Sequence, residues 1–161
     1  MKTEEDCFNI DILDLAMQCR AANLINKTCS EYFASKEPEV VKDNDIFQQE
    51  KVVMVKAHLN YMMLVIFREK TKALYVKDDK IRGHLELIAK VFALESLVKD
   101  SAAVFDSGFF GKGAGALLTR TYALAVSKLR PQLIPLAESF YIPDTMMPSV
   151  IGNSYGDIHE L

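Results

Sequence analysis

The sequence has no tryptophan and little proline or glycine. Proline occurs once before residue 131, at Pro38, and glycine occurs once before residue 108, at Gly83. These two residues interrupt helices most strongly, and the chain is otherwise rich in Ala, Leu, Glu, Lys and Met, so the composition predicts long helices. No internal repeat or low-complexity segment is visible. At 161 residues the chain has room for one domain.

Cysteine is also scarce, with Cys7, Cys19 and Cys29 as its three occurrences, all near the N-terminus. Their spacing fits no zinc-binding pattern, and a secreted disulfide scaffold usually holds an even number. We expect reduced thiols that serve packing, in an intracellular compartment.

Neither an excess of basic charge nor a membrane-spanning run is present. The net charge is −3 and the pI about 5.6, which argues against binding to nucleic acid or anionic lipid. The longest apolar stretch, Val52–Phe67, is interrupted by Lys56, His58 and Asn60, whereas a bilayer span needs about 20 apolar residues. The sequence therefore predicts a buried helix there and no membrane span. The acidic N-terminal residues do not form a signal peptide.

The apolar spacing predicts four main helices and a short fifth one. The polar stretch Ser35–Asn44 predicts a loop, and Ser107-Gly108 predicts a glycine cap at the end of the third helix. The expected fold is all-α, an up-and-down bundle of four main helices with a short C-terminal helical tail. Residues 1–10 would be an acidic lead and residues 11–161 the bundle. The expected helices are Asp11–Phe33, capped by Asn9 or Asp11, then Asp45–Val76, Ile81–Asp106, Ala116–Leu129 and a short helix from Pro131 to Phe140.

Two of the expected helices carry most of the predicted core. The helix from Ile81 is apolar on two faces, which predicts a central position between its neighbours. The helix from Asp45 would be the spine of the bundle, with His58 hydrogen-bonded at the edge of the core. Its predicted core stripe is Val52, Val55, Leu59, Met62, Ile66 and Ala73, widened on its flanks by Met63, Leu64 and Phe67.

No motif predicts a catalytic, cofactor-binding or metal-binding residue. The Gly111–Gly115 segment lacks the Lys-Ser or Lys-Thr of a phosphate loop and reads as an interhelical loop. His58, His84 and His159 lie on different elements and form no metal-binding pair. Glu95 is expected at the surface beside Lys99 rather than as a buried acid.

The C-terminal segment carries the most specific pattern. Leu129-Arg130 precedes a helix that ends in Phe140, followed by Ile142-Pro143-Asp144 and by Val150-Ile151-Gly152 with Tyr155-Gly156-Asp157-Ile158. This order resembles the closing segment of the acyl-CoA oxidases. The resemblance to their C-terminal helical domain extends from about Leu13 to Asp157, with diffuse matches at Val55–Lys70 and Leu94–Phe105. The family's arginine after the glycine is absent, since Asn153 follows Gly152.

The resemblance implies a role in a flavoenzyme of fatty-acid β-oxidation. Such enzymes hold FAD and oxidise acyl-CoA to trans-2-enoyl-CoA, with O2 giving H2O2. The family's catalytic glutamate and flavin-binding motifs lie upstream of this domain, so the chain alone is expected to hold no cofactor and to be inactive. Its role would be to help form the dimer and close the flavin site.

The resemblance also implies partners and a compartment. The partners would be the flavin- and acyl-CoA-binding domains of the parent enzyme or a homologous subunit, with a homodimer possible. The compartment would be the peroxisome, although His159-Glu160-Leu161 is not a Ser-Lys-Leu-type signal; otherwise it would be the cytoplasm. The alternatives are a free-standing helical interaction module without enzymatic activity, and an unrelated four-helix bundle. The structural or interface candidates are Arg130, Pro131, Phe140, Pro143, Asp144, Gly152, Tyr155 and Gly156.

Overall fold

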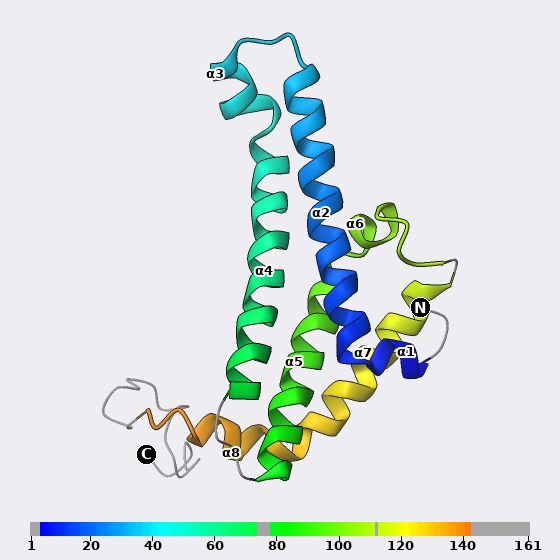
Figure 1. Ribbon diagram of the computed structural model, residues 1–161, viewed down its shortest axis with the longest axis vertical. Helices are drawn as coiled ribbons and strands as arrows, with labels where there is room; N and C mark the ends of the chain where they lie inside the picture. The colour runs from blue at the N-terminus through cyan, green and yellow to red at the C-terminus, as the bar shows by residue number, and fades with distance from the viewer. Residues whose placement is uncertain (1–3, 74–77, 112, 143–161) are drawn as a thin grey trace, which may run out of the picture. The chain divides into compact units, whose positions relative to one another are not determined.

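The computed structural model describes residues 4–73, 78–111 and 113–142, and within these ranges it contains helices and no strand (Figure 1). The all-α fold predicted from the sequence is confirmed. The chain divides into two compact units, Met1–Lys128 and Leu129–Leu161. None of the described helices is long and apolar enough to cross a bilayer.

The first unit is built on long helices that run in alternating directions (Figure 1). They are α2 (Ile10–Ala34), α4 (Gln48–Ala73), α5 (Asp79–Lys99) and α7 (Ala114–Leu129). The short helix α1 (Glu4–Phe8) precedes them. α5 lies against both α2 and α4, which confirms the predicted central position of this segment. The expected starts of the long helices are close to the observed ones. The predicted cap of α2 is present, since the Asn9 side chain accepts the Asp11 N–H at 2.9 Å.

The expected loop at Ser35–Asn44 is partly wrong, because most of it is helical. After a bend, α3 (Glu39–Val41) and the π-helix η1 (Lys42–Ile46) lead into α4. The Lys42 ammonium donates to the carbonyls of Tyr32 at 3.5 Å and Ser35 at 3.0 Å, which satisfies acceptors at the end of α2. The composition of this segment is polar, but the contacts of Lys42 fix its helical turns to the end of α2.

The expected single helix Ile81–Asp106 is also wrong, because it breaks at Asp100 into α5 and α6 (Ser101–Asp106). Asp100 leaves the helical region with φ −106° and ψ 39°. The buried Arg20 guanidinium donates to the Ser96 carbonyl at 2.7 Å and contacts the Asp100 carboxylate at 3.3 Å. The break therefore coincides with a contact from α2, which spacing along the chain could not predict. The predicted glycine cap is confirmed, since Gly108 has φ +70° just after α6.

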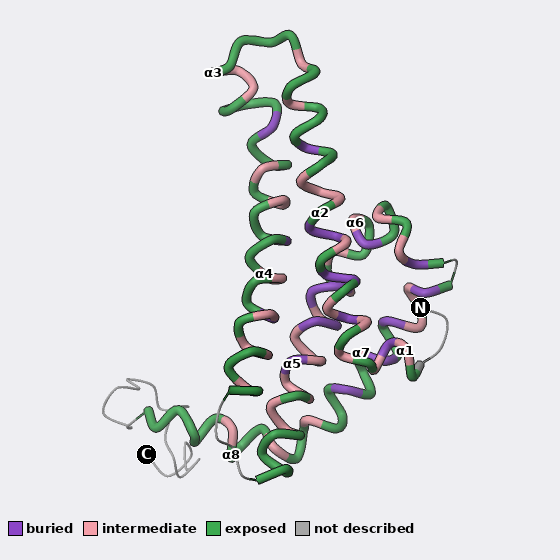
Figure 2. The backbone as a smooth tube through the Cα atoms, in the orientation of Figure 1, coloured by how far each residue is buried: buried purple, intermediate pink, exposed green. Residues whose placement is uncertain are grey.

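The core lies mainly among α1, α2, α5, α6 and α7, and α4 contributes Leu64 to it (Figure 2). The upper part of α2 and α4 forms a two-helix hairpin with few buried residues (Figure 2). Alanines at the contacts of α2, α4, α5 and α7 allow close helix approach. The core cluster contains Cys7, Leu13, Ala16, Met17, Leu64, Ala89, Ala93, Leu94, Leu97, Val104, Phe110, Ala114, Leu118 and Ala125.

The second unit begins with a short helical stretch, the 3₁₀ turn η2 (Arg130–Gln132) followed by α8 (Leu133–Glu138). Pro131 lies in the first turn, as predicted, because its missing N–H costs no helical hydrogen bond there. α8 ends two residues before the expected Phe140, and Tyr141 follows with a positive φ of 49°.

Candidate functional site

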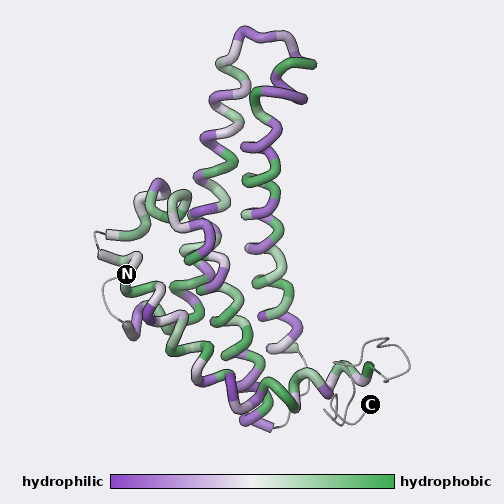
Figure 3. The backbone as a smooth tube through the Cα atoms, turned by 180° about the vertical axis from the view of Figure 1, so that it is seen from behind, coloured by the Kyte–Doolittle hydropathy of each residue, from purple (hydrophilic) through white to green (hydrophobic). Residues whose placement is uncertain are grey.

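The outer face of α4 is the largest departure from the predicted core. The residues predicted to form the spine of the bundle are exposed, with Val52 at 57%, Leu59 at 54% and Ile66 at 50%. Val55, Met62 and Ala73 are exposed as well, so the six residues of the predicted core stripe are all outside the core. Of the residues predicted on its flanks, Met63 is exposed, whereas Leu64 is buried and Phe67 packs against the core, as predicted. We define Val52, Val55, Leu59, Met62 and Ile66 as the outer stripe of α4. Figure 2 shows how little of α4 is buried, and Figure 3 shows hydrophobic residues recurring along it.

The opposite face of α4 explains this orientation. Ala57 and Leu64 are about 1% exposed, and Tyr61 and Phe67 pack beside them against the core. Ala57 is small enough for close approach to α2, whereas the outer stripe is bulkier. Since α4 is apolar around much of its circumference, sequence spacing alone left two possible inner faces.

Three residues of the outer stripe, Val52, Val55 and Leu59, line a groove of about 580 Å³. Its walls also include Lys51, Lys56, Asn60 and Met63. Met63 additionally lines a small apolar hollow of about 160 Å³, formed with residues of α5 such as Ile88 and Phe92. The apolar surface of α4 therefore continues toward α5, and it suits a macromolecular contact better than a small ligand.

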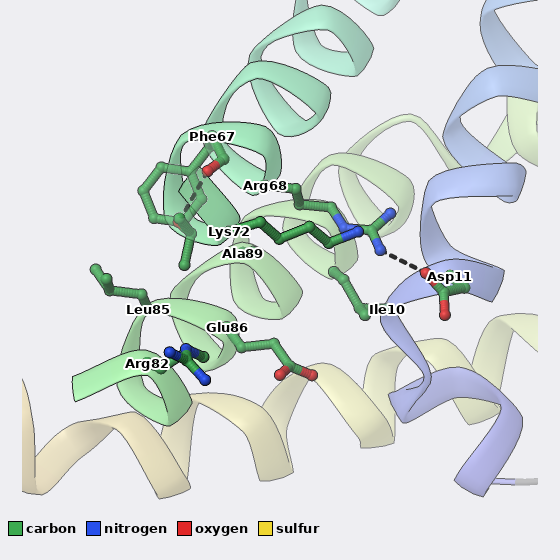
Figure 4. A pocket seen from close by; sticks show the side chains of 10 residues that line it. Ile10, Asp11, Phe67, Arg68, Lys72, Arg82, Leu85, Glu86 and Ala89 are labelled. Atoms are coloured by element: carbon green, nitrogen blue, oxygen red, sulfur yellow. Dashed lines mark hydrogen bonds and ion pairs between the residues drawn. The ribbon is translucent and has the colours of Figure 1, made fainter. Parts of the chain in front are cut away.

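A second, more polar pocket of about 370 Å³ lies between the start of α2, the end of α4 and the start of α5 (Figure 4). Arg68 projects from α4 toward the start of α2, where it pairs with Asp11 and, at 2.6 Å, with Asp14. Glu86 of α5 also lines the pocket, and its carboxylate pairs with Lys90 at 2.8 Å. The Arg68 pairs join α4 to α2, and the Glu86–Lys90 pair lies within α5, so these pairs support a structural role for the charges in the pocket.

A buried charge lies at the break between α5 and α6. Arg20 is fully buried, and burial lowers the pKa of its guanidinium while Asp100 opposes that shift. Nε and Nη2 of Arg20 have no hydrogen-bond partner among the described residues. This arrangement joins α2 to the break, and sequence spacing offered no signal for it.

The remaining sequence candidates form no reactive group. His58 is exposed rather than at the edge of the core, which corrects the prediction, and His84 lies on another helix. No cluster of three potential metal ligands occurs within the described ranges. Glu95 forms the predicted surface pair with Lys99 at 2.5 Å. Cys7 is buried, but Cys29 is exposed, so the expected packing role is wrong for Cys29.

The predicted interhelical loop Gly111–Gly115 ends earlier than expected, because α7 begins at Ala114. Gly113 has φ +85° immediately before α7, a conformation that disfavours other residues. A Cβ at Gly115 would lie 3.0 Å from the Phe105 ring, so this glycine admits a close ring contact. Both positions have structural reasons for glycine that require no ligand.

Comparison with known proteins identifies the family. A sequence model of the acyl-CoA oxidases matches residues 9–161. The chain belongs to the acyl-CoA oxidase family. The resemblance stated from the C-terminal segment is therefore confirmed over nearly the whole chain.

Individual acyl-CoA oxidases agree with this assignment and show how much of the family's length is present. Acyl-coenzyme A oxidase 2 of Candida maltosa is 25% identical over 142 residues, which are 87% of this chain and 20% of that protein. Acyl-CoA oxidase 1 of Arabidopsis thaliana shares the fold, with a TM-score of 0.87, 18% identity and coverage of 99% of this chain and 24% of that chain. Acyl-CoA oxidase 1 of Yarrowia lipolytica matches with a TM-score of 0.84, 21% identity and coverage of 99% and 23%. The chain thus spans about a fifth to a quarter of these acyl-CoA oxidases.

Of the predicted interface residues, the structure describes Arg130, Pro131 and Phe140. The first two lie in η2, and Phe140 follows α8 with 72% of its surface exposed. Pro143, Asp144, Gly152, Tyr155 and Gly156 lie outside the described residues. The interface candidate that sequence reasoning missed is the outer stripe of α4. Its spacing was visible in the sequence, but it was assigned to the core.

Proposed function

We propose that this chain acts as a non-catalytic C-terminal helical domain of an acyl-CoA oxidase-type flavoprotein of fatty-acid β-oxidation. It would dock against the flavin- and acyl-CoA-binding domains, help form the dimer and help close the flavin site. The parent reaction would convert acyl-CoA to trans-2-enoyl-CoA and O2 to H2O2. The proposed compartment is the peroxisome.

The exposed outer stripe of α4 is the observation that carries this proposal. Five large apolar side chains are exposed along one helix of a chain that matches only a fifth to a quarter of its relatives' length. A patch of this kind is costly to leave in water and is typical of protein interfaces. The missing surface would be supplied by the rest of the oxidase.

The chemistry of the described residues favours a structural role for this chain over a flavin site built from its own residues. A flavoprotein must position the isoalloxazine ring against the substrate with donors directed at the ring. In the polar pocket of Figure 4, Arg68 is paired with two aspartates and Glu86 with Lys90. These residues do not fit FAD by themselves, so the groups that hold it and remove the substrate proton would come from the other domains.

A segment exchange tests the proposal. In the oxidase of Candida maltosa, the segment matched by this chain is replaced by residues 9–161, and a second variant lacks the segment. We expect the exchanged enzyme to retain bound flavin and acyl-CoA-dependent peroxide formation, and the deletion variant to lose both. Flavin absorbance and peroxide release measure the two properties.

The isolated 161-residue chain is the matched control. With added FAD and a long-chain acyl-CoA, it should show neither bound flavin nor peroxide release. Turnover by the isolated chain would contradict a non-catalytic role. Full flavin content and activity in the deletion variant would contradict a role in closing the flavin site.

A further inference from the structure

The chain between α5 and α7 changes direction at both of its ends. At the first end, Asp100 leaves the helical region with φ −106° and ψ 39°. At the other end, Gly113 has φ +85° immediately before α7. We define residues 101–111, which comprise α6 and the turn after it, as the strap. Figure 1 shows α6 beside α2.

The strap is held together by contacts of its own. The Ser107 hydroxyl donates to the Val104 carbonyl at 2.6 Å and accepts the Phe109 N–H at 3.4 Å. The Phe110 ring packs edge-on against the rings of Phe105 and Phe109, with centroids 6.2 and 5.1 Å away. Since these contacts lie within the strap, they can persist when it moves as one piece.

Few side chains anchor the strap to the rest of the first unit. Val104 and Phe110 are its buried residues, and the Phe105 ring, 38% exposed, lies near Gly115 of α7. Segments with few buried apolar side chains open at a lower free energy than the core around them. The strap therefore has the properties of a unit that opens separately.

A contact from α2 holds the bend at Asp100. Nη1 of Arg20 donates to the Ser96 carbonyl at 2.7 Å and contacts the Asp100 carboxylate at 3.3 Å, so it ties the end of α5 and the break to α2. Nε and Nη2 of Arg20 have no hydrogen-bond partner among the described residues. Because α6 lies against α2, its departure would let water reach this side of α2 and hydrate the guanidinium.

The sequence favours a second arrangement, in which α5 and α6 form one helix. Leu97 and Val104 are seven residues apart, so a continuous helix would carry them on the same face. Ala102 and Ala103 are strong helix formers, and residues 84–107 contain neither glycine nor proline. Local preference and tertiary contact thus favour different conformations at the break, which is the condition for a two-state element.

We propose that the strap is a conformational device with a closed and an open state. In the closed state, the Arg20 contact holds the bend at Asp100, and Val104 and Phe110 are buried. In the open state, α6 continues the helix of α5, the strap leaves α2, and water reaches Arg20. The structure shows the closed state, and the open state is the minor one in the unmodified chain.

Native-state hydrogen exchange of the full 161-residue chain tests whether the strap opens separately. Its protected amides should exchange at least about tenfold faster than those of α5, with a weaker dependence on denaturant, because opening exposes less surface than global unfolding. Leu64→Ala should accelerate exchange in α5 and leave the strap unchanged, since it weakens the core in both states of the strap. Equal acceleration of the strap and α5 by Leu64→Ala would overturn the proposal.

A pair of spin labels measures the geometry of the open state. Lys80→Cys and Asp106→Cys place labels at exposed positions of α5 and α6, with Cys19 and Cys29 replaced by serine. A continuous helix would separate the two backbone positions by about 39 Å, at 1.5 Å per residue, and the bend shortens this distance in the closed state. Asp100→Ala should at least triple the population with the long distance, because the buried guanidinium loses its counter-ion and becomes hydrated on opening.

Asp100→Pro is the matched control. It removes the same carboxylate, but a proline inside a continuous helix clashes with the carbonyl four residues before it. This variant should therefore not populate the long distance. Circular dichroism confirms that both variants are helical. A long distance in both variants, or in neither, would overturn the proposal.

Discussion

At the scale of single residues, Arg20 is the least predictable feature of the chain. It lies within the apolar stripe of α2, yet its guanidinium is buried and directed at Ser96 and Asp100, at the break between α5 and α6. The Ser96 carbonyl also accepts the Asp100 N–H at 3.3 Å, so it retains a partner without Arg20. Loss of Asp100 would leave the buried guanidinium without its counter-ion. Loss of Arg20 would leave the Ser96 carbonyl with its hydrogen bond from the Asp100 N–H.

This asymmetry leads to a prediction for two substitutions. Asp100→Ala should lower the free energy of unfolding by about 3 kcal/mol, because it leaves a buried cation without its counter-ion. Arg20→Met should cost less than about 1 kcal/mol, since it removes the buried charge together with its unpaired nitrogens. Urea unfolding measures both changes. Equal costs for the two variants would show that the ion pair itself stabilises the break.

The hairpin tip carries a pH-sensitive contact. Asp43 accepts hydrogen bonds from Lys51 and from the Tyr32 hydroxyl, and these bonds lower the pKa of Asp43, with that from Lys51 the stronger cause. The same contact to Asp43 raises the pKa of Tyr32. Since the folded-state pKa of Asp43 lies below its value in an unfolded chain, about 3.9, the contact stabilises the tip above that pH.

Acidification should therefore loosen the tip. As the pH falls from about 4 through the lowered pKa of Asp43, amide exchange in residues 39–47 should accelerate relative to α5. Asp43→Asn is the control, because it removes this titration. A tip whose relative exchange rate does not change with acid in the unmodified chain would contradict the assigned role of Asp43.

At the scale of elements, α4 shows what determines which face of an apolar helix is buried. The inner face carries Ala57 and Leu64, and the outer face carries larger side chains that the unit leaves exposed. The sequence predicted the helix itself correctly, with ends close to Gln48 and Ala73. It predicted the wrong inner face, because both faces have apolar residues at helical spacing and only contact with α2 and α5 distinguishes them.

Two leucines on α4 provide a matched test of this assignment. Leu64→Ala should lower the free energy of unfolding by about 3 kcal/mol, because it opens a cavity in the core. Leu59→Ala, about one and a half turns away on the outer stripe, should change it by no more than about 0.5 kcal/mol. Chemical denaturation of both variants under the same conditions gives the comparison. A larger loss for Leu59→Ala than for Leu64→Ala would reverse the two faces of α4.

At the scale of the whole molecule, the described helices of the first unit leave the outer side of α4 uncovered. α5 covers the lower part of its inner side, and among the described long helices of this unit α2 lies beside its upper part (Figure 1). The family members that share this fold are four to five times as long, by the coverage of 20% to 24%. The exposed outer stripe supports the proposed docking of this unit against other domains of an oxidase.

Polar substitutions in the outer stripe should raise solubility without changing stability. Leu59→Glu with Ile66→Glu should increase the highest soluble concentration of the isolated chain, since the exposed patch promotes association. The midpoint of thermal unfolding should move by no more than about 3 °C, because neither residue contributes to the core. Light scattering and calorimetry measure these properties. A large fall in the midpoint would place these residues in the core.

The sequence by itself determined the helices, their approximate ends and the family. Scarce proline and glycine, regular apolar spacing and the Asn9 cap act locally, so they can be read along the chain. Only the tertiary structure decided which face of α4 is buried, where the helix breaks between α5 and α6, and that the hairpin tip is helical. The first two outcomes depend on partners far away in the sequence, such as α2 for Ala57 and Arg20 for Asp100. The tip depends on side-chain contacts of Lys42 and Asp43 across the turn. Helical spacing carries no information about which partner a side chain will meet.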